Sequence, residues 1–217
     1  MKLYAHPFSS YCQKALIALY EHQTPFEWKL LTFGSDELTA EHAALWPLQR
    51  MPVLVDGGRT LVETSIIIEY LDLHYPGPVR LIPKDPRAAL EVRMMDRIFD
   101  HYVMTPMQKF VFDALRPPER RDPHGVEEAR TLLDKTYAWL EGVMAGRTWA
   151  AGTDFSLADC AAAPSLFYAD WVHPIPPQHA QLRAYRQRLL ARPSFARAVE
   201  EARPYRAFFP LDAPDRD

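Results

Sequence analysis

A stretch rich in proline divides this chain into two parts. Between Tyr75 and Pro86 the sequence contains four prolines and one glycine. Proline has no backbone N–H group and a fixed φ, so such a stretch favours a linker over a packed helix or strand. The 217 residues of the chain can form two modest cores. The sequence therefore predicts one domain at residues 1–76, a linker at 77–86 and a second domain at 87–217.

The first domain shows strand and helix patterns in turn. Asp56-Gly57-Gly58 separates two β-rich runs and is a hairpin signal, which predicts that these runs are antiparallel. A loop at 34–36 leads into a short, mostly solvated helix. The strand candidates lie at 2–5, 26–31, 53–55 and 60–62, and the other helix candidates at about 10–22 and 64–74. The order β-α-β-α-β-β-α predicts an α/β fold for this domain.

The second domain is predicted to be all-α. Amphipathic runs lie at about 87–115, 125–144, 156–171, 178–191 and 194–202. Ser156 and Asp159 have the spacing of a capping box, which we interpret as structural. Residues 203–217 contain three prolines and three aspartates, so we expect a tail that lies on the surface or is disordered.

The overall charge and composition narrow the possible partners. With 25 basic and 28 acidic residues, the net charge of −3 argues against nucleic acid. No apolar run is long enough to span a membrane and the N-terminus does not resemble a signal peptide, so we expect a cytoplasmic protein. The eight histidines show no metal-ligand spacing, which predicts no metal. Cys12 and Cys160 are expected to be free thiols, with Cys160 in the core.

Ser9 and Ser10 lie where the first strand gives way to the first helix. The start of a helix carries unpaired N–H groups and a partial positive charge, and both stabilise an anion such as a thiolate. A serine there is also an ordinary N-cap residue. The pattern alone leaves both interpretations open.

Two later segments also allow a structural and a functional interpretation. Pro52 begins a strand, so the Met51-Pro52 bond is either trans at a sheet edge or cis, with the backbone of Met51 turned outward to pair with a peptide. Thr64 is a natural N-cap, and Glu63 and Thr64 could also bind the ammonium and carboxylate groups of a ligand.

These segments together resemble the glutathione S-transferase superfamily, in its serine-type classes and with some likeness to the zeta and theta classes. The resemblance rests on Ser9-Ser10-Tyr11-Cys12, on Met51-Pro52-Val53-Leu54, on Glu63-Thr64 with the helix after it, and on Phe155 to Asp159. It covers essentially the whole chain. It implies a thioredoxin-like N-terminal domain, a helical C-terminal domain and a homodimer.

The resemblance also implies roles for individual residues. Ser9 would hold the catalytic hydroxyl, with Ser10 second and Tyr4 as a rival. Cys12 would occupy the resolving position of a redox pair whose first cysteine is missing, which argues against disulfide exchange. Glutathione, the co-substrate, would bind through Arg50, Met51, Pro52, Glu63 and Thr64.

The activity that the resemblance implies is conjugation of glutathione to a small, largely apolar electrophile. Its pocket would lie between the domains, against the helix expected at 87–115. The alternatives are a glutathione-dependent isomerase, dehalogenase or reductase on the same fold, or an interaction protein without catalytic activity.

Overall fold

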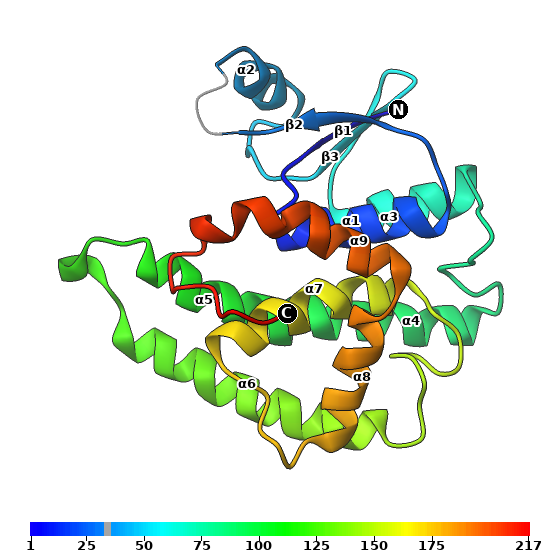
Figure 1. Cartoon of the computed structure of the whole chain (residues 1–217). Coiled ribbons are helices and arrows are strands. Elements are labelled where there is room, and N and C mark those ends of the chain that lie inside the picture. Colours follow the sequence, from blue (N-terminus) through cyan, green and yellow to red (C-terminus); the bar gives the residue numbers. More distant parts are fainter. Residues whose placement is uncertain (33–35) are drawn as a thin grey trace.

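The computed structural model describes residues 1–32 and 36–217 and divides them into a sheet-containing part and a helical part (Figure 1). The loop predicted at Gly34 and Ser35 lies outside these residues. The segment from Tyr75 to Asp85 contains neither helix nor strand and joins the two parts. None of the described helices is long and apolar enough to cross a membrane. The domain boundaries given above stay a prediction.

Four short strands form one mixed sheet. They are β1 (Lys2–Ala5), β2 (Glu27–Leu30), β3 (Val53–Asp56) and β4 (Arg59–Leu61). The sheet order is β2-β1-β3-β4, with β1 parallel to β2 and antiparallel to β3. The β3–β4 pair is antiparallel, and Gly57 and Gly58 give its turn the positive φ values of 54° and 83° that glycine adopts readily. The predicted order and hairpin are confirmed.

Three helices flank the sheet. They are α1 (Ser10–Glu21), α2 (Asp36–Leu45) and α3 (Thr64–His74). Figure 1 shows α1 and α3 between the sheet and the C-terminal helices, and α2 on the other side. Leu16 of α1 and Ile67 of α3 are fully buried in one cluster with Leu3 and Leu54 of the sheet. The sheet buries its apolar face against these helices, which is the largest favourable contribution to such a fold.

The C-terminal part is helical, as predicted. Its helices are α4 (Pro86–Ile98), α5 (Thr105–Ala114), α6 (Pro123–Met144), α7 (Leu157–Val172), α8 (Ala180–Leu190) and α9 (Pro193–Ala202), with short turns η1 (Phe99–Met104), η2 (Pro118–Arg120) and η3 (Arg203–Phe208). Helix α7 is the centre of this part, because every residue from Leu157 to Asp170 is buried. The predicted capping box is confirmed, since the Ser156 N–H donates to Asp159 Oδ2 at 2.9 Å. Cys160 is a buried core thiol.

The single helix predicted at 87–115 is interrupted. Between α4 and α5 the chain makes a π-helical turn, η1. Pro106 follows this turn and has no N–H group for the carbonyl one helical turn earlier, so an unbroken α-helix would lose a hydrogen bond there. The N–H and the hydroxyl of Thr105 both donate to the carbonyl of Asp100 instead.

The expectation of a surface tail at 203–217 holds for its first part, because η3 has no buried residue, whereas the alternative of disorder does not hold there. Residues 203–208 form η3, and Phe209 is buried. The prolines and aspartates of this segment suggested a tail, but its aromatic side chains anchor it. His6 stacks edge-on against Tyr205 at 4.5 Å, and Phe209 contacts Trp171 at 5.2 Å between ring centroids.

Candidate functional site

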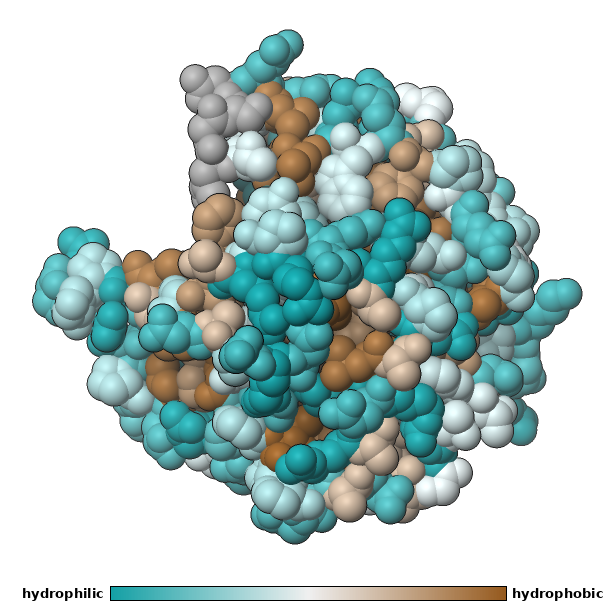
Figure 2. All heavy atoms as spheres, viewed as in Figure 1, coloured by the Kyte–Doolittle hydropathy of each residue, from teal (hydrophilic) through white to brown (hydrophobic). Residues whose placement is uncertain are grey.

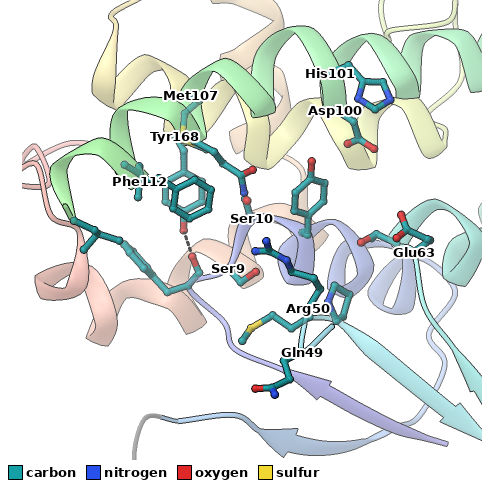
Figure 3. A pocket seen from close by; sticks show the side chains of 18 of the residues that line it. Ser9, Ser10, Gln49, Arg50, Glu63, Asp100, His101, Met107, Phe112 and Tyr168 are labelled. Carbon is teal, nitrogen blue, oxygen red and sulfur yellow. Dashed lines mark hydrogen bonds between the residues drawn. The ribbon is translucent and has the colours of Figure 1, made fainter. Parts of the chain in front are cut away.

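A cavity of about 620 Å³ lies between the two parts of the chain (Figure 3). All seven residues proposed from the sequence line it, namely Ser9, Ser10, Arg50, Met51, Pro52, Glu63 and Thr64. They come from the start of α1, from the segment before β3 and from the start of α3. The fold therefore brings together residues that are up to 55 positions apart in the sequence. Their roles in binding and catalysis stay predictions.

Ser9 is the N-cap residue of α1. Its Oγ accepts a hydrogen bond from the Cys12 N–H at 3.4 Å, which leaves the hydroxyl hydrogen available to a ligand. Ser10 is the first residue of the helix, and its side chain is buried. Among the described residues, the N–H groups of Ser10 and Tyr11 have no hydrogen-bond partner. This end of α1 can therefore stabilise an anion in the cavity.

The chain just before Ser9 is held by buried side chains. The Tyr168 hydroxyl of α7 donates to the Phe8 carbonyl at 3.0 Å (Figure 3). The Gln13 amide donates to the Pro7 carbonyl and to the Tyr168 hydroxyl, each at 3.0 Å. Sequence reasoning missed Gln13 and Tyr168, because nothing in the local pattern shows a contact across 160 residues.

Tyr4, the rival for the catalytic hydroxyl, does not line the cavity. Its ring is buried, and its hydroxyl donates to Glu41 Oε1 of α2 at 2.6 Å. Burial and the bond to Glu41 raise the pKa of Tyr4 to about 12. The hydrogen bond from this hydroxyl therefore holds α2 against the sheet.

Cys12 is fully buried and does not line the cavity. Burial raises the pKa of the Cys12 thiol to about 12, although Ser9 and the His6 backbone lower it in part. The other cysteine, Cys160, is also free and buried, and burial raises its pKa as well. Since thiolates are the reactive form, neither residue supplies a nucleophile at neutral pH.

The Met51-Pro52 peptide bond is cis. The segment before it is fixed by His42 of α2, whose Nε2 lies 3.1 Å from the carbonyl oxygen of Arg50. The side chain of Arg50 reaches into the cavity between the two serines and Gln49 (Figure 3).

The prediction that Thr64 is an N-cap is wrong. Thr64 is the first residue of α3, and Glu63 occupies the cap position without a side-chain hydrogen bond to the helix. Glu63 has a φ of 66°, and Gln49, across the same cavity, has a φ of 50°. Left-handed backbone at residues other than glycine costs free energy, and such residues tend to cluster at functional sites, although Gln23 and Asp212 also adopt it away from the cavity.

A polar wall from the C-terminal part faces Glu63, and sequence reasoning missed it. Arg97 of α4 and Asp100 and His101 of η1 line the cavity there. Asp100 forms an ion pair with Lys14 of α1, and its Oδ2 lies 2.8 Å from Lys14 Nζ. Burial raises the pKa of Asp100, although the Lys14 charge opposes this.

Tyr11 contributes a phenol hydroxyl to the polar part of the cavity. The residue lines the cavity, and its phenol has no hydrogen-bond partner among the described residues. Burial and the charge of Asp100 raise the pKa of Tyr11 to about 12, so the phenol is neutral at physiological pH and can donate a hydrogen bond.

The remaining wall of the cavity is apolar. It consists of Phe8, Trp46, Met107, Val111, Phe112, Leu115, Phe208 and Phe209, with Pro210, and the polar Gln108 of α5 also lies in it. Figure 3 shows Met107 and Phe112 at one end and Glu63 and His101 at the other, with the serines between them. In the part of the chain that the structure describes, no group of three or more His, Cys, Asp or Glu residues could hold a metal ion.

Two protein families match successive parts of this chain. The glutathione S-transferase N-terminal domain matches residues 3–79, and the glutathione S-transferase C-terminal domain matches residues 103–193. The chain belongs to the glutathione S-transferase superfamily. This confirms the resemblance seen in the sequence and the combination of an α/β domain with a helical domain.

Several individual proteins are similar over nearly the whole chain. A protein of Coxiella burnetii named Stringent starvation protein A homolog is 29% identical over 93% of this chain and 92% of its own. A protein of Vibrio cholerae named Probable maleylacetoacetate isomerase is 29% identical over 93% of this chain and 96% of its own. A glutathione S-transferase of Methylobacillus flagellatus, solved with glutathione bound, is 25% identical, with a TM-score of 0.81 over 91% of this chain and 98% of its own.

Proposed function

We propose that this protein is a glutathione transferase that conjugates the thiolate of glutathione to a small, largely apolar electrophile. The observation that carries this proposal is the hydroxyl of Ser9 at the start of α1, beside a cavity with one polar and one apolar end. The polar end suits a charged tripeptide, and the apolar end suits the second substrate.

Ser9 would act by making the thiol of glutathione more acidic. A thiol with a pKa of about 8.5 is only a few per cent ionised at neutral pH, and lowering this pKa by about two units requires roughly 2.7 kcal/mol of preferential stabilisation of the thiolate. A hydrogen bond from a hydroxyl to a charged acceptor contributes about 1.5–3 kcal/mol, and a helix N-terminus about 0.3–1 kcal/mol. Together these contributions are large enough.

Glutathione itself would bind along the N-terminal domain. The backbone of Met51, before Pro52, would pair with the peptide, and Glu63 and Thr64 would bind its ammonium and carboxylate groups. Arg50 would bind a second carboxylate. The glutathione bound to the Methylobacillus flagellatus relative supports the choice of ligand.

We also propose that the protein is a homodimer. Ile66 and Leu73 of α3 and Leu90 and Met94 of α4 are large apolar side chains exposed on two adjacent helices, which Arg93 and Glu69 connect through an ion pair. An exposed apolar area of this kind is typical of a protein interface.

The protein would act in the cytoplasm, in the detoxification of electrophiles.

The test is conjugation by the purified protein. We expect it to bind glutathione in calorimetry and to consume the thiol in the presence of a generic electrophile such as an aryl halide. A chain that neither binds glutathione nor consumes its thiol would refute the proposal and favour an interaction protein without catalytic activity.

An isomerase is the second candidate, because one relative is named Probable maleylacetoacetate isomerase. Product analysis distinguishes the two. Glutathione that is regenerated together with a rearranged substrate indicates isomerisation, and glutathione that becomes covalently bound to the product indicates conjugation. A reductase is the weaker alternative, because Cys12 is buried with a raised pKa.

A further inference from the structure

His6 closes the turn between β1 and α1. Its carbonyl oxygen accepts the Ser9 N–H at 3.0 Å, and its ring nitrogen Nδ1 accepts the Phe8 N–H at 3.1 Å. The two N–H groups just before α1 are therefore bonded to one residue. Asp and Asn side chains make this pattern in an Asx turn, in which a side-chain oxygen accepts the N–H two residues later in the chain. In this turn an imidazole nitrogen takes the place of that oxygen.

The other side of the turn is held by its carbonyl groups. The Phe8 carbonyl accepts from the Tyr168 hydroxyl at 3.0 Å. The Ser9 carbonyl accepts from the Gln13 N–H at 2.9 Å. Phe8 is therefore bonded at both its N–H and its carbonyl group. Because Ser9 is the next residue, loss of the bond to the His6 ring would let Phe8 rotate and would move Ser9.

The ring of His6 lies under the C-terminal segment. It is buried, and its centroid lies 4.5 Å from that of Tyr205 and 6.3 Å from that of Phe208. Figure 1 shows this segment in red beside the start of α1, and Figure 2 shows hydrophilic side chains in the middle of the same face, where the chain ends. Aromatic rings of the segment thus cover the imidazole, and hydrophilic side chains face the solvent.

Burial also determines the protonation state of the ring. It lowers the pKa of His6 below the usual 6.5, so the imidazole is neutral at physiological pH. A neutral imidazole has one N–H group, and because Nδ1 accepts the Phe8 N–H, the proton is on Nε2. A proton on Nδ1 would bring two donors together and break this hydrogen bond.

We propose that His6 is a positioning residue for Ser9: its neutral ring, by accepting the Phe8 N–H, places the Ser9 hydroxyl where it meets the thiol of glutathione. His6 does not line the cavity, so it acts on the ligand through Ser9. The inference rests on the proposed function and adds a residue on which the role of Ser9 depends. A hydrogen bond to a developing charge loses much of its effect when its donor is displaced by about 1 Å.

Two substitutions separate hydrogen bonding from packing. His6→Asn keeps an acceptor for the Phe8 N–H but removes the ring that packs against Tyr205. His6→Leu keeps a side chain of similar volume but has no acceptor. We expect the pKa of the bound glutathione thiol to stay within about 0.5 units of the wild-type value in His6→Asn and to rise by about one unit in His6→Leu, which is a tenfold change in its ionisation constant. The ultraviolet absorbance of the thiolate measures both.

The reverse order of the two variants would overturn the proposal, because Leu replaces a residue that only fills space better than Asn does. The matched control is His22→Leu, since His22 is a buried histidine at the other end of α1 that does not line the cavity. This variant should leave the pKa of the bound thiol unchanged. An equal rise in the control would show a general effect of losing a buried histidine and would also contradict the proposal.

The tautomer of His6 tests the proposal without a substitution. Nitrogen NMR of the ring in the wild-type protein near neutral pH should show a proton on Nε2 and none on Nδ1. A proton on Nδ1 would overturn the proposal, because that nitrogen could then not accept the Phe8 N–H.

The failure of this inference can be distinguished from the failure of the proposed function. Wild-type protein that binds glutathione and lowers the pKa of its thiol, together with a His6→Leu variant that does the same, refutes the role of His6 alone. Wild-type protein that does not bind glutathione in calorimetry refutes both.

Discussion

In the proposed function, Ser9 has two tasks that involve different atoms of one hydroxyl group. Its oxygen accepts the Cys12 N–H and so begins α1. Its hydrogen would be donated to the thiolate under the proposed function, and the hydrogen bonds from Tyr168 and Gln13 fix the backbone just before it. The structural and functional interpretations of Ser9 are therefore compatible.

Replacing Ser9 tests both tasks. We expect Ser9→Ala to lower kcat/KM for conjugation by about 10²-fold, since it removes a hydrogen-bond donor to a charged group, and to lower the free energy of unfolding by about 1 kcal/mol because the cap is lost. Steady-state kinetics and urea unfolding measure the two effects separately.

Two companion variants sharpen this test. Ser9→Thr keeps a hydroxyl at the cap and should retain most of the stability. Ser10→Ala should reduce activity much less than Ser9→Ala. The opposite order of the two alanine variants would assign the catalytic hydroxyl to Ser10.

The residues that could be predicted from the sequence share a local signal. Ser9 precedes a helix, Pro52 begins a strand and Glu63 lies where a strand meets a helix, so each position shows in the pattern of its neighbours. Asp100 and Tyr168 act through partners far away in the chain, Lys14 and Phe8. A local sequence pattern cannot predict contacts between residues that are far apart in the chain, so these contacts appear only in the folded structure.

At the scale of elements, α1 connects the two domains. Lys14 in its middle pairs with Asp96 at 2.6 Å and with Asp100 at 2.8 Å. At its end, Glu21 accepts two hydrogen bonds from Arg192, at 2.8 and 2.6 Å, just before α9. The helix that carries Ser9 is thus held by charges on the opposite domain.

The Glu21–Arg192 pair should make stability depend on pH. Burial raises the pKa of Glu21, but hydrogen bonds from Arg192 and Ser194 outweigh this and hold it below its usual value of 4.5. A carboxylate with a lowered pKa in the folded state stabilises the fold above pH 4.5, and this contribution is lost as the pH falls through the folded-state pKa.

We therefore expect Glu21→Gln to lower the free energy of unfolding near pH 7 by about 2 kcal/mol, and the difference from wild type to shrink at acid pH below 4.5. Chemical unfolding across this pH range measures it. Glu127→Gln, in the exposed pair with Arg130, is the control and should change little. A difference that is constant with pH would mean that the charge of Glu21 does not stabilise the fold.

Element boundaries were predicted well where a periodic pattern met a proline or a cap. The prediction of one helix at 87–115 missed η1. Pro106 inside this run is a signal of an interruption, but the pattern does not show that the interruption takes the form of a π-helical turn. At the end of the chain, the composition left a surface tail and disorder open, and it gave no sign that Phe209 is buried against α7.

On the scale of the whole molecule, the two-domain architecture followed from the sequence because the pattern changes period at the proline-rich stretch. The cavity between the domains could be expected only from the family resemblance. Its division into a polar and an apolar end depends on how α4, η1 and α5 pass over α1, which the sequence does not show.

The proposed dimer is tested at this scale. We expect Leu90→Glu to convert the protein into a monomer, because it places a charge in the apolar surface between two copies. Analytical ultracentrifugation measures the mass of both forms. Trp139→Glu, on α6 and away from this surface, should leave the mass unchanged. A wild-type protein that sediments as a monomer at micromolar concentration would exclude the dimer.

The most direct test of the account is the ionisation of glutathione in the complex. The ultraviolet absorbance of the thiolate, followed against pH, gives the pKa of the bound thiol. We predict a value about two units below the usual 8.5 in the wild type and a return towards 8.5 in Ser9→Ala. A bound thiol that titrates like free glutathione in the wild type would contradict the proposed role of Ser9.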